Sequence, residues 1–176
     1  TRLRRTGIID LSDLGATLAV AKAAGVYGPQ AAMAMHGSRK FGSLPAIVDE
    51  RGTRTYQDVD DDSTRLARGL KGFGIHEGSV VALLCRDHHG LIIAMAACGK
   101  LGARLVLMNT GFAKPQFAQV CERENVEIVL HDSEFFGLLD ALPADLPRVL
   151  TWLDNGTECS PVAQTIDDLI AANSTE

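Results

Sequence analysis

The stretch from Gly78 to Asn109 reads GSVVALLCRDHHGLIIAMAACGKLGARLVLMN, and its pattern decides the fold class. Val80 to Leu84 is a continuous apolar run without alternation, which is typical of a strand buried on both faces. Leu91 to Leu101 is apolar almost all round and predicts a buried helix, with Gly102 as its left-handed cap. Arg104 to Met108 is a second apolar run, which we interpret as a second buried strand. Two such strands joined by one helix predict a parallel, right-handed crossover.

The alternation of strand and helix continues toward the C-terminus. Helices are predicted at Pro115 to Glu124, Glu134 to Leu142 and Thr165 to Ala172, and strands at Val126 to His131 and Arg148 to Leu153. This order predicts an α/β fold with a mostly parallel sheet flanked by helices.

A hairpin and a capped helix are predicted ahead of the crossover. Ala46 to Asp49 and Thr53 to Tyr56 flank a glycine-containing turn, as in a β-hairpin. Thr55 is the predicted N-cap of the following helix, with Asp58 three residues on in a capping box. One face of that helix carries Val59, Ser63, Leu66, Leu70 and Phe73, and the glycines Gly72 and Gly74 end it.

The first 41 residues form a separate pattern. Residues 8–25 and 31–39 have helical spacing, and Gly25, Gly28 and Pro29 are expected to break the helix between them. We therefore divide the chain into a helical N-terminal arm, residues 1–41, and an α/β subdomain, residues 42–176. The arm either covers the core of its own domain, which its alanine-rich composition favours, or makes peripheral contact with a membrane surface.

Composition narrows the class of protein. The chain has 176 residues, 46% of them hydrophobic, and a net charge of −5, which argues against nucleic acid as a partner. The four cysteines, Cys85, Cys98, Cys121 and Cys159, show no paired spacing, so we expect a reducing, cytoplasmic compartment. No apolar run approaches the length that spans a bilayer. The chain begins with Thr1 rather than Met, which we interpret as the start of a segment cut from a longer protein.

The candidate site residues have simpler structural interpretations. Cys85, His88 and His89 follow a strand, where α/β proteins place their sites, but a zinc site needs a further ligand that the sequence does not indicate. A helix cap by His88 or Asp87 is the favoured interpretation. The acidic group Asp58, Asp60, Asp61 and Asp62 is expected in a first helical turn, where it complements the helix dipole rather than binding a metal. The isolated histidines His36, His76 and His131 are interpreted as structural or solvated.

Glycine patterns for nucleotide binding are missing from the sequence. Gly69, Gly72 and Gly74 fall at the end of a helix rather than between a strand and a helix, so they do not form a dinucleotide-binding turn. No phosphate loop of the Gly-x-x-x-x-Gly-Lys type and no nucleophile elbow occurs. We therefore assign no catalytic, cofactor-binding or metal-binding residue.

From about Pro45 to Leu139 the chain resembles the N-terminal part of the adenylate-forming enzymes, nearest to the fatty acyl-CoA synthetases. The matching pieces are Ala46-Ile47-Val48-Asp49, Thr55-Tyr56-Gln57-Asp58-Val59, Leu66-Ala67 with Leu70, Phe73-Gly74-Ile75 before Gly78, Val80 to Leu84, Gly99-Lys100-Leu101-Gly102-Ala103, Leu107-Met108-Asn109-Thr110 and Val126-Glu127-Ile128-Val129. The chain departs from the family pattern at Ser79, where Asp is usual, and at Asp87-His88, where Asn is common.

The resemblance implies the N-terminal part of the large domain of such a synthetase, truncated before the phosphate-binding loop. For the parent protein it implies ATP-dependent activation of a fatty acid to an acyl-adenylate, with magnesium, followed by thioester formation with coenzyme A. The family's phosphate loop, adenine motif, ribose-binding Asp and catalytic Lys do not occur in this sequence. We therefore expect the chain to be inactive alone, to bind no cofactor, and to self-associate through an exposed apolar face. Two alternatives are a free-standing α/β small-molecule-binding module and a truncated paralogue that binds a full-length synthetase.

Overall fold

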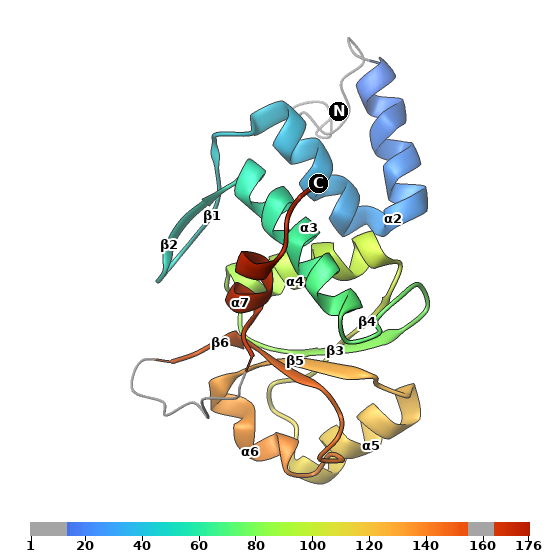
Figure 1. Cartoon of the computed structure of the whole chain (residues 1–176), viewed down its shortest axis with the longest axis vertical. Helices are drawn as coiled ribbons and strands as arrows, with labels where there is room; N and C mark the ends of the chain where they lie inside the picture. The colour runs from blue at the N-terminus through green and yellow to red at the C-terminus, as the bar shows by residue number, and fades with distance from the viewer. Residues whose placement is uncertain (1–13, 155–163) are drawn as a thin grey trace.

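A parallel four-stranded sheet in the order β4-β3-β5-β6 forms the centre of the fold (Figure 1). The computed structural model describes residues 14–154 and 164–176. The strands are β3 (Val80–Leu84), β4 (Arg104–Leu107), β5 (Ile128–Asp132) and β6 (Arg148–Trp152). Every neighbouring pair in this sheet is parallel, which confirms the predicted α/β class.

The crossover that the sequence predicts is present. All five residues of β3 are buried, and α4 (His89–Leu101) leads from it toward β4. Gly102 caps α4 in the left-handed conformation, with φ 71°, and its amide donates to the carbonyls of Cys98 and Gly99. The prediction that the second strand is buried is wrong: Leu107 is 58% exposed because β4 is the edge strand of the sheet.

Helices cover both faces of the sheet (Figure 1). On one face lie α3 (Tyr56–Lys71), α4 and α7 (Ile166–Ala172), and on the other lie α5 (Lys114–Glu124) and α6 (Phe136–Leu139). Because successive side chains of a strand point to opposite faces, Val81 and Leu83 join the first core while Ala82 and Leu84 join the second. A strand buried on both faces must be apolar throughout, as β3 is.

The predicted hairpin forms a separate two-stranded antiparallel sheet from β1 (Pro45–Asp49) and β2 (Gly52–Thr55). The predicted capping box is also present. The Thr55 hydroxyl accepts from the Asp58 amide at 3.1 Å, and the Asp58 carboxylate accepts from the Thr55 amide at 2.8 Å. The hairpin therefore leads directly into a well-capped α3.

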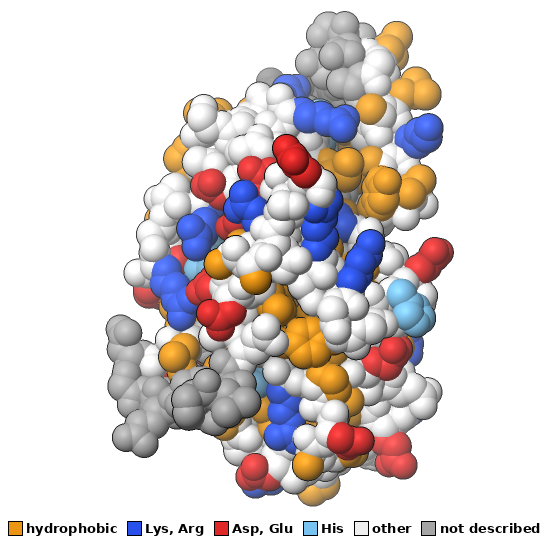
Figure 2. Space-filling model, in the orientation of Figure 1, with side chains coloured by type: hydrophobic (Ala, Val, Ile, Leu, Met, Phe, Trp, Pro, Cys, Tyr) orange, Lys and Arg blue, Asp and Glu red, His pale blue; other side chains and the backbone are white. Residues whose placement is uncertain are grey.

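Helix α2 (Leu14–Phe41) has two limbs that meet at a kink. The break lies at Gly28, with φ 77°, followed by Pro29; Gly25, which was also expected to break the helix, lies within it. The second limb buries Ala31, Ala32 and Ala34, as expected of a cover for the core. The first limb is different, since Leu18 is 70% exposed, and Figure 2 shows hydrophobic side chains over this helix.

Peripheral membrane contact through the arm and the boundary at residue 41 stay predictions. In residues 14–154 and 164–176, no helix is long and apolar enough to cross a bilayer. Three predictions fall outside the described ranges: residues 8–13 of the first helix, the loop at residues 155–161, and Cys159 within that loop.

Two predicted elements are shorter than expected. The helix expected at residues 134–142 is a 3₁₀ turn, Ser133–Phe135, followed by α6. Beyond α6 the amides of Ala141 and Leu142 bond three residues back, so no α-helix continues. Strand β5 starts two residues late because the Val126 amide bonds the Cys121 carbonyl and closes the end of α5.

Candidate functional site

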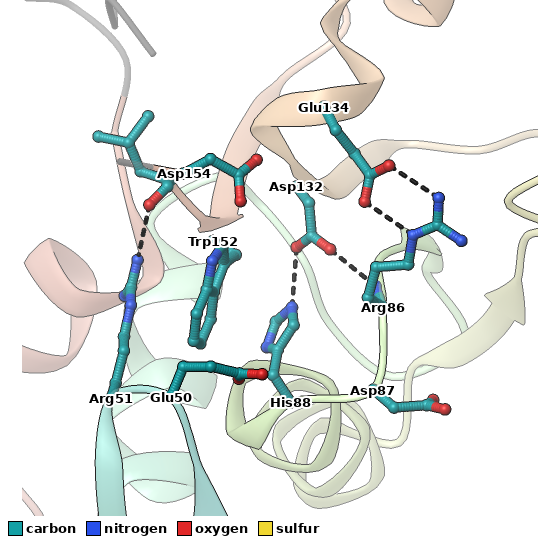
Figure 3. A pocket seen from close by; sticks show the side chains of 10 residues that line it. Glu50, Arg51, Arg86, Asp87, His88, Asp132, Glu134, Trp152 and Asp154 are labelled. Carbon is teal, nitrogen blue, oxygen red and sulfur yellow. Dashed lines mark hydrogen bonds and ion pairs between the residues drawn. The ribbon is translucent and has the colours of Figure 1, made fainter. Parts of the chain in front are cut away.

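A cleft of about 450 Å³ lies at the carboxyl edge of the sheet, where α/β folds commonly bind ligands (Figure 3). The ends of β3, β5 and β6 form it together with the turn of the β1–β2 hairpin. Its lining residues are Glu50, Arg51, Arg86, Asp87, His88, Asp132, Glu134, Trp152, Leu153 and Asp154.

Asp132 is the hub of this edge. Its side chain is almost fully buried, and one carboxylate oxygen accepts from His88 Nε2 at 2.9 Å and from Thr151 Oγ1 at 2.5 Å. The other oxygen accepts from the Arg86 amide at 2.7 Å. The bonds that Asp132 of β5 accepts therefore join it to the end of β3, the start of α4 and β6, and they compensate the burial of the carboxylate.

His88 caps α4, as the sequence predicts. Its Nδ1 accepts from the Gly90 amide at 3.1 Å, so the proton of the neutral ring is on Nε2 and is donated to Asp132. This hydrogen-bond pattern assigns the tautomer. Neither nitrogen keeps a free lone pair, which leaves His88 without a base function in this arrangement.

Asp132 also provides the carboxylate that the sequence did not indicate beside Cys85 and His88. The ligand atoms of these three residues lie within 4.8 Å of one another. A metal on His88 Nε2 would need a proton on Nδ1, which faces the Gly90 amide hydrogen. Burial, followed by the charge of Asp132, raises the pKa of the Cys85 thiol to about 12. The hydrogen-bonded pair of His88 and Asp132, with a protonated Cys85 thiol beside it, therefore fits a structural anchor better than a metal site.

His89 belongs to a different contact, since the structure pairs it with the hairpin. Its Nδ1 lies 2.6 Å from the Asp49 carboxylate, which also accepts from the His89 amide at 2.8 Å. Burial raises the pKa of Asp49, but the hydrogen bonds from His89 and Arg51 outweigh it and hold this pKa below its ordinary value. Asp49 thereby fastens the hairpin to the start of α4.

Both arginines of the cleft are engaged by the protein. Arg86 forms a two-point ion pair with Glu134, with both distances 2.7 Å. Arg51 lies over the Trp152 ring, 4.0 Å from its centroid, and bonds the Leu153 carbonyl at 3.2 Å and Asp167 at 3.1 Å.

The remaining charge of the cleft is negative, since five carboxylates line it against two guanidinium groups. Such a surface repels phosphates, and its lining, as far as the structure describes it, contains no glycine-rich cradle for them. ATP, magnesium-bound ATP and coenzyme A therefore do not fit the residues here, and we assign none of these residues to them.

Of the four aspartates expected in one first helical turn, only Asp58 lies in the first turn of α3, because that helix begins at Tyr56. The other three follow in the next turn, so that part of the prediction is wrong. The Asp58 pKa is lowered by its hydrogen bonds with Thr55, and Asp60 lies 2.6 Å from Lys100 of α4. Asp62 is half-buried, and this burial raises its pKa. Among the isolated histidines, His131 is buried and bonds the backbone oxygen of Asp132, while burial lowers its pKa. Asp58 and His131 support the fold, as expected, whereas Asp60 does so through its pair with Lys100 rather than through the helix dipole.

Sequence reasoning did not identify Asp132, Trp152 or Arg51. Asp132 follows an apolar run, so its place at the end of a parallel strand could have marked it as a candidate. Arg51 and Trp152 carry no comparable local signal, because their partners lie far away in the sequence.

Comparison with known proteins places this fold in a family. The AMP-binding enzyme family matches residues 35–171, which is well over half of the chain. The fatty acid–[acyl-carrier-protein] ligase ScoC of Streptomyces coeruleorubidus is 27% identical over 111 residues, which are 63% of this chain and 21% of the relative. The 4-hydroxybenzoate–CoA/benzoate–CoA ligase of Rhodopseudomonas palustris is 25% identical over 123 residues, which are 70% of this chain and 23% of the relative.

A solved structure agrees in fold. The Mycobacterium tuberculosis fatty acyl CoA synthetase superposes with a TM-score of 0.68 and 21% identity, covering 84% of this chain and 29% of that one. The chain thus spans between a fifth and a third of the length of these proteins. On the match of residues 35–171, the chain belongs to the AMP-binding enzyme family.

Proposed function

We propose that this chain is the N-terminal structural portion of an acid–CoA ligase. In the proposed reaction, ATP and magnesium activate a carboxylic acid to an acyl-adenylate, and coenzyme A then forms the thioester. The observation that carries the proposal is the family match over residues 35–171. The parallel sheet and its helices, which resemble a solved fatty acyl CoA synthetase, support it.

A fatty acid is the acid that we propose. The ligase of Streptomyces coeruleorubidus, by its name, acts on a fatty acid, and the short motifs from Ala46 to Val129 resemble the fatty acyl-CoA synthetases. The benzoate ligase relative makes an aromatic acid the competing choice. Activity measured with each acid separates the two classes.

The contribution of these residues is to support a site rather than to form it. Asp132 joins the strand ends, and Asp49 and Arg51 fasten the hairpin beside them. Carboxylates dominate the described lining of the cleft and both of its arginines are already paired, which disfavours binding of a triphosphate. We therefore propose that the chain alone is inactive and that other residues of the longer protein hold ATP and coenzyme A.

ATP–pyrophosphate exchange tests the proposal. The 176-residue chain and the protein encoded by the complete reading frame would each be assayed with a medium-chain fatty acid, a long-chain fatty acid and benzoate. We expect exchange only with the longer protein, and more with a fatty acid than with benzoate. Exchange by the 176-residue chain would refute its scaffold role, and a preference for benzoate would refute the proposed acid.

The cleft beside Trp152 favours a second candidate function, that of a free-standing binding module. A module of this kind would bind a small molecule at the carboxyl edge without the rest of a ligase. A reading frame that stops after Glu176 and saturable binding that depends on Trp152 would favour this candidate. A truncated paralogue would instead co-purify with a full-length synthetase.

A further inference from the structure

The β1–β2 hairpin is a separate sheet whose turn reaches across to the carboxyl edge of the main sheet. Two of its residues make long-range polar contacts. Asp49 bonds His89 of α4, and Arg51 bonds residues more than a hundred positions away along the chain. The hairpin turn therefore joins segments that are distant in sequence.

The guanidinium of Arg51 makes three kinds of contact at once. The indole of Trp152 lies under it at 4.0 Å, the Leu153 carbonyl accepts one hydrogen bond, and the Asp167 carboxylate accepts another. An aromatic face, a neutral acceptor and an anionic acceptor are the three contacts that a planar guanidinium prefers. Figure 3 shows Trp152 between Arg51 and His88.

The floor of this site is held in place by the buried hub. The His88 ring packs on Trp152 with a centroid distance of 4.6 Å, and Asp132 holds that ring through its Nε2. Trp152 therefore keeps its position through contacts that do not involve Arg51. A preformed surface of this kind can accept a guanidinium that is not attached to the hairpin.

We propose that Trp152, the Leu153 carbonyl and Asp167 form a guanidinium-binding seat, which the chain fills with its own Arg51 so that the hairpin acts as a strap to α7. Asp167 lies in the first turn of α7, so this contact couples the hairpin to that helix. When Arg51 leaves, the seat accepts an external guanidinium, such as the arginine side chain of a partner protein.

A purely electrostatic contact makes a different prediction. The side chains of Arg51 and Asp167 are 31% and 51% exposed. An ion pair as exposed as this contributes little to the stability of the fold by itself. If charge alone mattered, a lysine would serve as well as arginine. A seat shaped for the planar fork requires arginine or a free guanidinium.

Chemical rescue tests the seat. We would compare the full chain with Arg51→Ala, Arg51→Lys and the control Arg123→Ala. The exposed side chain of Arg123 pairs, among the residues that the structure describes, with the neighbouring Glu124 alone. Two measurements report on the strap: acrylamide quenching of Trp152, the single tryptophan of the chain, and hydrogen exchange of residues 45–55 and 166–172. Circular dichroism would check that each variant is folded.

We expect both Arg51 variants to increase quenching about twofold and exchange in both segments about tenfold, with the control unchanged. Methylguanidinium at about 1–50 mM should reverse both changes saturably in Arg51→Ala, whereas methylammonium should not. Three results would overturn the proposal. Arg51→Lys could keep the hydrogen-exchange protection of the wild type, or both cations could rescue Arg51→Ala. Exchange could also become faster in the hairpin while that of α7 stays unchanged. If Arg51→Ala does not fold, Arg51→Lys decides the question with the same measurements.

Discussion

Replacing Asp132 with Asn tests the hub at the carboxyl edge. The carboxylate accepts three hydrogen bonds, from His88 Nε2, Thr151 Oγ1 and the Arg86 amide. An amide of the same shape turns one acceptor into a donor, so at least one N–H would face another donor in a site that is only 2% exposed. Losing a charge-assisted bond and burying an unpaired donor each cost about 1–3 kcal/mol. We expect Asp132→Asn to lower the free energy of unfolding by about 3 kcal/mol.

Urea unfolding followed by Trp152 fluorescence measures this change, because Trp152 is the single tryptophan and packs on His88. The matched control is Asp140→Asn, whose carboxylate is exposed and pairs with Lys114 on the surface. The control should change stability by less than about 0.5 kcal/mol. A loss below about 1 kcal/mol for Asp132→Asn, with an unchanged dependence on urea, would refute the account of the hub.

The remaining predictions concern the helix caps and the exposed surface. Gly102→Val should lower the free energy of unfolding by more than about 1 kcal/mol, because φ is 71° there and a Cβ would lie 3.0 Å from Glu77; an unchanged melting curve would count against it. The folded-state pKa of Asp58 is below the ordinary value of 3.8, so its cap should stabilise the fold above that pH and be lost as the pH falls through the lowered pKa. Comparing urea midpoints of the wild type and Asp58→Asn between pH 2 and 7 checks this, and an equal difference at all pH values would contradict it. The exposed side chains of Leu18 and Met33 should promote self-association, which sedimentation velocity would detect. The double variant Leu18→Glu with Met33→Glu should reduce it. A wild-type chain that is monomeric at every concentration would contradict this prediction.

The crossover could be predicted from sequence because its signals are local. An unbroken apolar run specifies a strand buried on both faces, as β3 is, and a glycine after an apolar helix specifies a left-handed cap, as at Gly102. The Thr55 capping box was predictable for the same reason, since both partners lie within four residues. These features depend on neighbours along the chain.

The features that were missed depend on the order of the strands. The run at β4 is apolar enough for an interior strand, but the sheet places it at the edge, and no local pattern records that position. The bond between His88 and Asp132 joins residues 44 apart, and the bond between Arg51 and Asp167 joins residues 116 apart. The candidate site could therefore be located at a strand end from sequence, but its partners could not.

Binding of magnesium-ATP to the 176-residue chain tests the scaffold role most directly. Isothermal titration calorimetry would measure it at low ionic strength, with Arg86→Gln as the comparison because Arg86 lines the cleft. We expect no saturable heat up to millimolar nucleotide, since the carboxylates of the cleft outnumber its guanidinium groups and both arginines are already paired. Saturable binding that Arg86→Gln weakens would contradict it and place the nucleotide in this cleft.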